Sequence, residues 1–393
     1  MRIGVIWGLF YKLNLLSFIP SHRAADAHIM VIGCGALGNE VLKNLALLGV
    51  GHLTLVDFDR VEADNLCKSV LFSAEDAAAR RYKVDAAADA LRRLNPDMQI
   101  ERHYGDAVYD PGLGVFARQD VVIGCVDSRW ARYGINRNCM RAGVPWVDGG
   151  IGQREGTARV FRPGENCYAC NLGTEGLKEL RLRLPCPNIV RRNIAAGKAP
   201  TSVLSASIIA AVQVQEALKL LCPEALAEGH VRSLCGSIFH YEGEQLSGRT
   251  ASFRAWDEDC PCHERWTPDG TLPVDVEQTS VEQLLALARR LTGEEDPTLL
   301  LRDDCFVDWV EDRRDGTRYE VMLPGRKVEP FMETHPALQG AESARFYQNE
   351  WKEASKIFPY QKLSLSSLGI PQCDFLRFQG KEKDYCYELR KPL

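Results

Sequence analysis

Residues 28–38 decide the fold, and they read His28-Ile29-Met30-Val31-Ile32-Gly33-Cys34-Gly35-Ala36-Leu37-Gly38. The short apolar run that ends in glycines is typical of a buried strand followed by a tight turn. Residues 39–48 then place apolar side chains at helical spacing, and residues 53–56 are strand-like and end at Asp57. Strand, glycine turn, helix and strand in this order predict a βαβ unit of a parallel sheet.

The pattern continues along the chain with alternating helical and strand-like segments. We expect helices over 77–94, 129–142 and 202–221, buried strands over 121–126 and 146–148, and an irregular crossover loop over 164–193. Such alternation predicts a doubly wound, Rossmann-like α/β fold with a mostly parallel sheet.

The character of the sequence changes after about residue 266. Ser280 and Gln283 form a capping box before an amphipathic helix, and Asp315-Gly316 is typical of a hairpin turn. Residues 375–378 and 385–389 suggest a final hairpin. We therefore expect three parts: an N-terminal segment over 1–27, an α/β domain over 28–265, and a smaller α+β domain over 266–393.

Composition limits the location and the partners. The net charge is −5 with acidic and basic residues mixed, which argues against a nucleic-acid partner. Residues 1–27 contain short apolar runs and a sequence, Ala25-Asp26-Ala27, that imitates a signal-peptidase site, but no run approaches the roughly 18 apolar residues of a membrane span. We expect a peripheral N-terminal segment, no membrane partner, and a cytoplasmic protein, because its 14 cysteines in a chain of this length favour a reducing compartment.

Gly33, Gly35 and Gly38 form a G-x-G-x-x-G motif between a strand and a helix. These glycines let the backbone approach phosphates, which then lie at the helix N-terminus. Asp57 ends the second strand, where a carboxylate can accept hydrogen bonds from ribose hydroxyls. The motif alone would favour NAD, so the residues after Asp57 decide between NAD and ATP.

Those residues are Asp57-Phe58-Asp59 and then Asn65-Leu66-Cys67-Lys68. They resemble the D-x-D and N-L-x-R motifs of the ThiF/MoeB/HesA adenylating family, which includes the ubiquitin-activating enzymes. The resemblance covers about residues 28–265 and continues through Lys83, Asn95-Pro96, the segment 124–129, Arg132, Asn136, the segment 147–150, Cys167-x-x-Cys170 and residues 206–219.

The resemblance implies ATP and Mg²⁺ as cofactors. Attack of a carboxylate on the α-phosphate gathers negative charge, which needs cations. Lys83 is then expected to neutralise phosphate charge and Asp127 to hold Mg²⁺. The other implied nucleotide contacts are Asp57 on the ribose, Asp59 and Asn65 in the pocket, and Lys68, which stands where the family has an arginine.

Two features depart from the family pattern. The glycine-arginine-proline that usually precedes the lysine reads Arg80-Arg81-Tyr82. Many members also begin with an arginine-rich segment that reaches the partner's ATP site across a dimer, and here Arg23 is the only candidate. The resemblance still implies a homodimer.

A second group of residues suggests a structural Zn²⁺ site. Cys167-x-x-Cys170 and Cys260-Pro261-Cys262-His263 offer two thiolate pairs about ninety residues apart. Cys260 and His263 keep the C-x-x-C spacing of the family, so we expect Cys167, Cys170, Cys260 and His263 as ligands, with Cys262 as the alternative fourth.

Cys186 lies within the predicted crossover loop, in Leu184-Pro185-Cys186-Pro187. In thioester-forming relatives this loop carries the cysteine that accepts the activated protein from AMP, and a thiolate suits that step. Nearby arginines such as Arg181 and Arg183 would lower the pKa of such a thiol.

The sequence leaves several functions open. The first is ATP-dependent adenylation of a ubiquitin-like protein ending in glycine, followed by thioester formation and transfer to a conjugating enzyme, which Cys186 and the long C-terminal part favour. The second is a sulfur-carrier adenylyltransferase for molybdopterin or thiamine synthesis, which stops at the adenylate. A non-catalytic scaffold with a degenerate site is the third, and an NAD oxidoreductase is a distant fourth.

Overall fold

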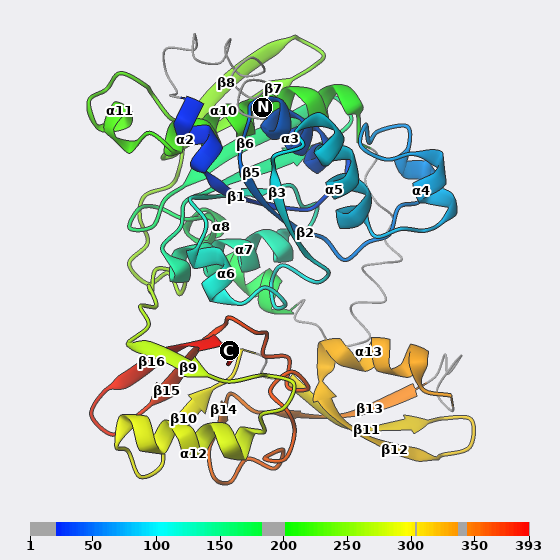
Figure 1. Ribbon diagram of the computed structural model, residues 1–393, viewed down its shortest axis with the longest axis vertical. Coiled ribbons are helices and arrows are strands. Elements are labelled where there is room, and N and C mark those ends of the chain that lie inside the picture. The colour runs from blue at the N-terminus through cyan, green and yellow to red at the C-terminus, as the bar shows by residue number, and fades with distance from the viewer. Residues whose placement is uncertain (1–20, 183–200, 303–304, 337–343, 393) are drawn as a thin grey trace, which may run out of the picture. The chain divides into compact units, whose positions relative to one another are not determined.

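The computed structural model describes residues 21–182, 201–302, 305–336 and 344–392. The chain forms two compact units (Figure 1). Within the described residues, the larger unit comprises 21–111, 115–177 and 201–265. The smaller unit comprises 112–114, 178–182 and the described residues from 266 onward.

The larger unit is built on an eight-stranded sheet with the order β3-β2-β1-β4-β5-β6-β7-β8. The first five strands in this order, β3, β2, β1, β4 and β5, pair in parallel. Strands β6, β7 and β8 continue the sheet as an antiparallel meander. The strands are β1 (His28–Ile32), β2 (His52–Val56), β3 (Gln99–His103), β4 (Val121–Gly124), β5 (Trp146–Ile151), β6 (Glu155–Phe161), β7 (Ser237–Glu242) and β8 (Ser247–Ser252). The predicted mostly parallel α/β sheet is confirmed.

Helices cover both faces of this sheet (Figure 1). The helices that lie wholly or partly in the larger unit are α2 (Ser21–Asp26), α3 (Ala36–Leu47), α4 (Ala74–Ala78), α5 (Lys83–Leu94), α6 (Leu113–Ala117), α7 (Arg129–Ala142), α8 (Tyr168–Leu182), α10 (Val203–Leu220) and α11 (Pro223–Ala227), with a 3₁₀ turn η2 at Ala63–Asn65. Alternate strand residues such as Ile29 and Val31 pack with α3, α5 and α10. Met30 and Ile32 point to the opposite face and are equally buried. Helix α7, which contacts β4 and β5, brings a separate set of buried side chains.

The strand order reverses at β1. The chain runs from β1 outward to β2 and β3 and then returns to β4 on the other side of β1. In open α/β sheets, ligands bind at the carboxyl ends of the two strands that flank such a reversal. This places the segment after β1 and the segment after β4 at the expected binding edge.

The helix predicted over 77–94 is wrong in its first part, because the structure contains two helices there. Helix α4 ends at Ala78 and α5 begins at Lys83. Arg80, between them, has a φ of 47°, a left-handed conformation that interrupts a right-handed helix. Ser73 caps α4 by accepting a hydrogen bond from the backbone of Asp76, so the first helix is a local unit of its own.

The irregular loop predicted over 164–193 is also partly wrong. Residues 168–182 form α8, with a kink at Gly173, whose φ is 66°. The polar composition of this segment reflects a partly exposed helix rather than a loop. The later residues 183–193 of the prediction lie outside the described part of the chain.

Helix α10 is long and apolar enough, by length and composition, to cross a membrane. In this fold it packs against α3, β5 and β6, and its residues Ile209, Val214 and Ala217 lie in the main core. The buried helix predicted from its alanine- and valine-rich sequence is confirmed, and the core accounts for its composition.

The smaller unit combines two sheets with helices α12 (Val281–Thr292) and α13 (Gly325–Thr334). A five-stranded sheet has the order β14-β10-β15-β16-β9, and a three-stranded sheet has the order β12-β11-β13. The capping box of α12 and the hairpin between β15 and β16 agree with the sequence patterns. The strands are β9 (Gly270–Pro273), β10 (Thr298–Leu300), β11 (Cys305–Asp312), β12 (Arg318–Pro324), β13 (Ala344–Glu350), β14 (Glu353–Ala354), β15 (Phe375–Gln379) and β16 (Asp384–Arg390).

Candidate nucleotide and metal sites

The glycine loop between β1 and α3 makes very close backbone contacts. Gly33 has a φ of 92°, and a Cβ added there would lie 2.6 Å from the carbonyl oxygen of Cys125. A Cβ on Gly38 would lie 1.9 Å from the carbonyl oxygen of Gly33. A Cβ on Gly35, by contrast, would meet nothing within 4 Å. The first and third glycines therefore build the turn, while the second faces open space, as a phosphate-binding loop requires.

Asp57, directly after β2, fixes this loop from the side. Its carboxylate accepts a hydrogen bond from the Cys34 backbone N–H at 2.6 Å and another from the Asp59 backbone N–H at 2.8 Å. Burial raises the pKa of Asp57, an effect that the nearby Lys83 ammonium and these two N–H groups oppose. The carboxylate thus holds the loop and lies at the strand end where a ribose would bind.

Lys83 is the first residue of α5, and its side chain is only 7% exposed. Its ammonium donates a hydrogen bond to the Asp59 carboxylate at 2.6 Å. Burial by itself lowers the pKa of Lys83, but the carboxylates of Asp57 and Asp59 outweigh it and the net shift is upward. A protonated, largely desolvated cation therefore lies beside the two aspartates that follow β2, where it interacts with charge more strongly than in water.

Asp127 lies three residues beyond the end of β4 and is exposed. The loop that carries it is fixed by Arg132, whose guanidinium donates to the backbone carbonyls of Val126 at 2.7 Å and Gly149 at 3.0 Å and to the buried carboxylate of Asp148 at 2.9 Å. Since β4 lies beside β1, this loop and the glycine loop share one edge of the sheet. Asp127 is thus an available carboxylate on a rigid loop at the strand reversal.

The turn after Asp59 contains the remaining predicted nucleotide contacts. Asn65 is buried, and its side-chain oxygen Oδ1 accepts a hydrogen bond from the Glu62 backbone N–H at 3.1 Å, so its contacts here hold the turn. Lys68 is half-buried, and within the described residues its ammonium forms no hydrogen bond or ion pair. Cys67 beside it is exposed.

Asn39 is a site residue that sequence reasoning missed. It is fully buried in the first turn of α3, and its amide donates to the backbone carbonyls of Cys34 at 2.7 Å and Gly35 at 3.1 Å. Its oxygen accepts the Leu71 backbone N–H at 2.8 Å. Asn39 therefore ties the glycine loop to the segment after Lys68. The signal in the sequence is an asparagine at a position that should be apolar, directly after the last glycine.

Cys167, Cys170, Cys260 and His263 come together in the larger unit, with their donor atoms all within 4.8 Å of one another. The Cys167 sulfur lies 3.7 Å from that of Cys170 and 3.6 Å from that of Cys260. These separations exceed the roughly 2 Å of a disulfide. They are near the roughly 3.8 Å expected between two sulfurs that bind one tetrahedral Zn²⁺ at about 2.3 Å. The donor set and spacing fit a four-coordinate metal site.

His263 rather than Cys262 belongs to this cluster. The Nε2 atom of His263 lies 3.1 Å from the Cys170 sulfur, and the Trp256 ring stacks on the imidazole at 3.7 Å between centroids. Cys262 is buried but is not part of the group.

Cys186 and Arg23 are two further residues with roles predicted from the sequence. Cys186 lies outside the described residues, so the structure gives no position for it. Arg23, the candidate for a residue that reaches a partner, forms an exposed ion pair with Glu224 of the same chain at 3.0 Å.

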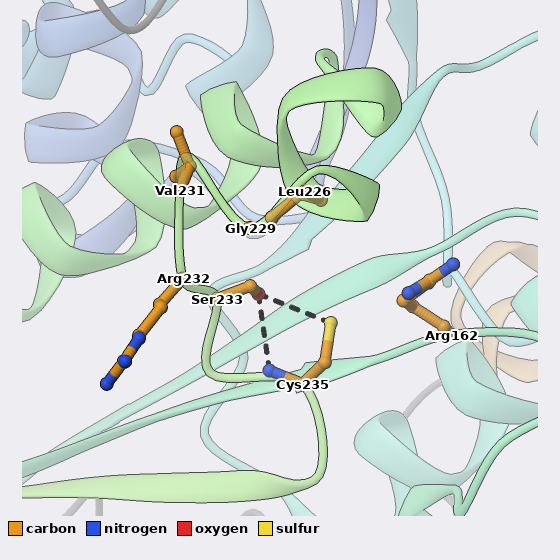
Figure 2. A pocket seen from close by; sticks show the side chains of 7 residues that line it. All are labelled: Arg162, Leu226, Gly229, Val231, Arg232, Ser233 and Cys235. Atoms are coloured by element: carbon orange, nitrogen blue, oxygen red, sulfur yellow. Dashed lines mark hydrogen bonds between the residues drawn. The ribbon is translucent and has the colours of Figure 1, made fainter.

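The larger unit also contains a surface hollow of about 470 Å³. Figure 2 shows the side chains that line it. It is lined by Arg162, Leu226, Gly229, Val231, Arg232, Ser233 and Cys235. Arg162 directly follows β6, whose last residue pairs with the first residue of β5, so the hollow lies at the amino edge of the parallel strands. None of the predicted site residues lines it.

A doubly wound sheet with a glycine loop, an aspartate after β2 and a buried lysine at the strand reversal defines the larger unit as a nucleotide-binding α/β domain. The particular family follows from sequence comparison. The model of the ThiF family matches residues 14–262, well over half of the chain, and the chain belongs to this family.

Relatives of known function span most of this region. The molybdopterin-synthase adenylyltransferase of Escherichia coli strain K12 is 33% identical over 58% of this chain and 84% of that protein. The SAMP-activating enzyme E1 of Haloferax volcanii is 32% identical over 61% of this chain and 81% of that protein. The crystal structure of E. coli MccB with succinimide is 18% identical, with a TM-score of 0.49 over 62% of this chain and 68% of that chain.

Gly35 and Gly38 should respond differently to substitution by alanine. Gly35→Ala should leave the melting temperature unchanged, because a φ of −74° suits alanine and the added methyl group contacts no protein atom within 4 Å. The same methyl group should weaken ATP binding by roughly tenfold or more, because it fills the space in which a phosphate would bind. Gly38→Ala forces a backbone shift and should lower the melting temperature by several degrees, as expected for a cost of about 1–3 kcal/mol. Differential scanning fluorimetry and ATP titration measure both effects. Unchanged ATP affinity in Gly35→Ala would contradict the assignment of the phosphate site.

Proposed function

We propose that this chain uses MgATP to adenylate the C-terminal carboxylate of a small carrier protein of the ubiquitin-like or sulfur-carrier type. The observation that carries the proposal is the buried Lys83 ammonium beside Asp57 and Asp59, next to the glycine loop, in a member of the ThiF family. A hydride-transfer enzyme would not need a buried lysine at this position, whereas attack at a phosphate does.

The charges at the site suit this reaction. Attack of a carboxylate on the α-phosphate concentrates negative charge on the phosphate oxygens, and a fixed, desolvated cation stabilises that charge. Lys83 supplies the cation and is held in place by Asp59, with which a bound phosphate would compete for the ammonium. Lys68 is a second cation, with no partner among the described residues. Asp127 would hold Mg²⁺, which adds positive charge at the phosphates when bound.

The relatives support two versions of the function. One of them is a molybdopterin-synthase adenylyltransferase and another a SAMP-activating enzyme E1, so both sulfur-carrier and modifier activation are represented at similar identity. We infer a carrier that ends in glycine for this chain, with a homodimer as the assembly. Transfer to a conjugating enzyme is part of the modifier version only.

Adenylation should require Lys83 and Asp127. Lys83→Ala and Asp127→Ala should each lower carrier-dependent exchange of labelled pyrophosphate into ATP by about 100-fold or more, because each removes a group that stabilises or organises the developing charge. The assay uses the full chain, MgATP and candidate carriers from the same genome.

Lys43→Ala and Asp97→Ala are the matched controls. Lys43 pairs with Glu40 on α3, and Asp97 is exposed in the turn before β3, so both variants should exchange pyrophosphate at the wild-type rate. Exchange without a carrier, or tighter binding of NAD than of ATP, would contradict the proposal. A folded protein that shows no exchange with any candidate carrier would favour the non-catalytic scaffold.

We also propose that Cys167, Cys170, Cys260 and His263 bind a structural Zn²⁺. Their donor spacing supports this, and the ligands connect the start of α8 to the end of the larger unit.

Purified protein should contain about one Zn per chain by elemental analysis, and Cys167→Ser should lower both the metal content and the melting temperature. Cys139→Ser, at another buried cysteine outside the cluster, is the control that should keep its metal. A metal-free wild-type protein of unchanged stability would refute the site.

We further propose that Cys186 accepts the carrier from the adenylate as a thioester. The support is its sequence position between the metal-binding cysteines and α10, and the similarity to an E1-type relative. The thiolate would attack the acyl-adenylate carbonyl, the thioester bond would form, and AMP would leave.

A non-reducing gel of enzyme, carrier and MgATP tests this step. A band at the summed mass should appear, vanish with dithiothreitol and be absent in Cys186→Ala, whereas pyrophosphate exchange should survive that substitution. Cys67→Ala is the control, since Cys67 is the exposed cysteine near the nucleotide loop. A band that persists in Cys186→Ala would assign the thioester to another cysteine. Exchange without any band would favour the sulfur-carrier version.

A further inference from the structure

Helix α5 begins at Lys83 without a side-chain cap. Tyr82 is the N-cap residue, with a φ of −61° and ψ of 139°, and its side chain accepts no hydrogen bond from the helix. A helix without a side-chain cap has a first turn that is less firmly held. Because Lys83 is the first helical residue, the position of its ammonium depends on what holds residue 82 instead.

The Tyr82 ring is packed between two other side chains. The Arg60 guanidinium lies 3.9 Å from the centroid of the Tyr82 ring, and the Tyr104 ring meets Tyr82 edge-on at 5.1 Å and 70°. Cation–π and edge-on aromatic contacts of this kind stabilise the packing of the ring. They hold residue 82 in place of the cap that the helix lacks.

The backbone around Tyr82 is paired with the segment after β2. Arg60 and Tyr82 form an antiparallel bridge, in which Val61 donates to the carbonyl of Arg81 at 2.8 Å and Lys83 donates to the carbonyl of Asp59 at 3.0 Å. The bridge sets Lys83 directly opposite Asp59. The side chains of the same two residues, Arg60 and Tyr82, also contact each other, and this contact stabilises the backbone pairing.

The first turn of α5 has one more support. The carboxylate of Asp85 accepts hydrogen bonds from the Tyr104 hydroxyl at 2.8 Å and from Arg102 at 2.7 Å. Tyr104 therefore contacts the start of α5 twice, through its ring at Tyr82 and through its hydroxyl at Asp85. The start of the helix is held by side chains from the segment after β2 and from the end of β3.

We propose that Tyr82 is a positioning residue for adenylation: its ring, held by Arg60 and Tyr104, fixes the backbone that carries Lys83 and so places the Lys83 ammonium for the phosphate. The inference rests on the proposed function of Lys83. In this role Tyr82 acts through the backbone rather than through contact with the nucleotide. Its φ of −61° is also that of proline, and among the described residues its N–H forms no hydrogen bond, so proline can hold the same backbone without a ring.

The test compares Tyr82→Ala, Tyr82→Phe and Tyr82→Pro in carrier-dependent pyrophosphate exchange. Tyr82→Ala should lower kcat by roughly tenfold with little change in KM for ATP, because a cation displaced by about 1 Å loses much of its effect on the transition state. The lost ring contacts should also lower the melting temperature by a few degrees, as they do in any variant without the ring. Tyr82→Phe keeps the ring and should match wild type. Tyr82→Pro keeps the backbone and should recover most of the lost rate.

Arg60→Ala provides an independent check. It should lower kcat by a similar factor, and the Arg60→Ala/Tyr82→Ala double variant should be no worse than either single one, because the two side chains act as a unit. Tyr347→Ala is the matched control, since Tyr347 has Arg318 over its ring at 4.7 Å in the smaller unit and should exchange at the wild-type rate.

Each other outcome overturns the proposal. Wild-type kcat in Tyr82→Ala would show that the ring positions nothing. Equal losses in Tyr82→Ala and Tyr82→Pro would show that the ring itself contacts the nucleotide. If Lys83→Ala retains full exchange, the proposed function of Lys83 fails. If Lys83→Ala is inactive and Tyr82→Ala is not, only the role of Tyr82 fails.

Discussion

The close approach between the glycine loop and the chain after β4 is the constraint on which the site depends. Gly33 and Gly38 have no room for a Cβ, because the carbonyl oxygens of Cys125 and Gly33 occupy that space. Asn39 and Asp57 then satisfy the polar groups of the loop from either side. A rigid turn with open space only at Gly35 is the result, and it directs the N-terminus of α3 toward whatever binds at the strand reversal.

The charges around this loop centre on one buried cation, Lys83, near two carboxylates. Lys83 is almost buried, yet its net pKa shift is upward because Asp57 and Asp59 flank it. Burying a cation is costly unless it is paired, so the two aspartates make the lysine tolerable in the folded protein. The Asp59 side chain is 38% exposed, so the Lys83 ammonium can be reached from solvent on that side. A phosphate could therefore compete with Asp59 for the ammonium. Arg132 has a different role, since its contacts with Asp148 and two backbone carbonyls fix the loop that carries Asp127.

The sequence predicted the parts of the structure that depend on local pattern. The strand, glycine turn and helix around Gly33, the buried helix α10 and the hairpin of β15 and β16 follow from periodicity and turn residues. The grouping of Cys167 and Cys170 with Cys260 and His263 was predicted from ligand spacing. The break at Arg80 was missed, because arginine favours helices and its left-handed conformation is set by tertiary contacts. Asn39 and the Arg60–Tyr82–Tyr104 group were missed for a related reason, since their partners are distant in sequence and become visible only in the fold.

The central claim is that the carrier's own carboxylate attacks ATP, and isotope transfer tests it most directly. A carrier whose C-terminal carboxylate is labelled with oxygen-18 is incubated with the enzyme and MgATP, and hydroxylamine then releases the acyl group from the adenylate. We expect the released AMP to contain one labelled oxygen, and Lys83→Ala to release none. Unlabelled AMP, or ADP and phosphate in place of AMP, would show that the carboxylate does not attack the α-phosphate and would contradict the account.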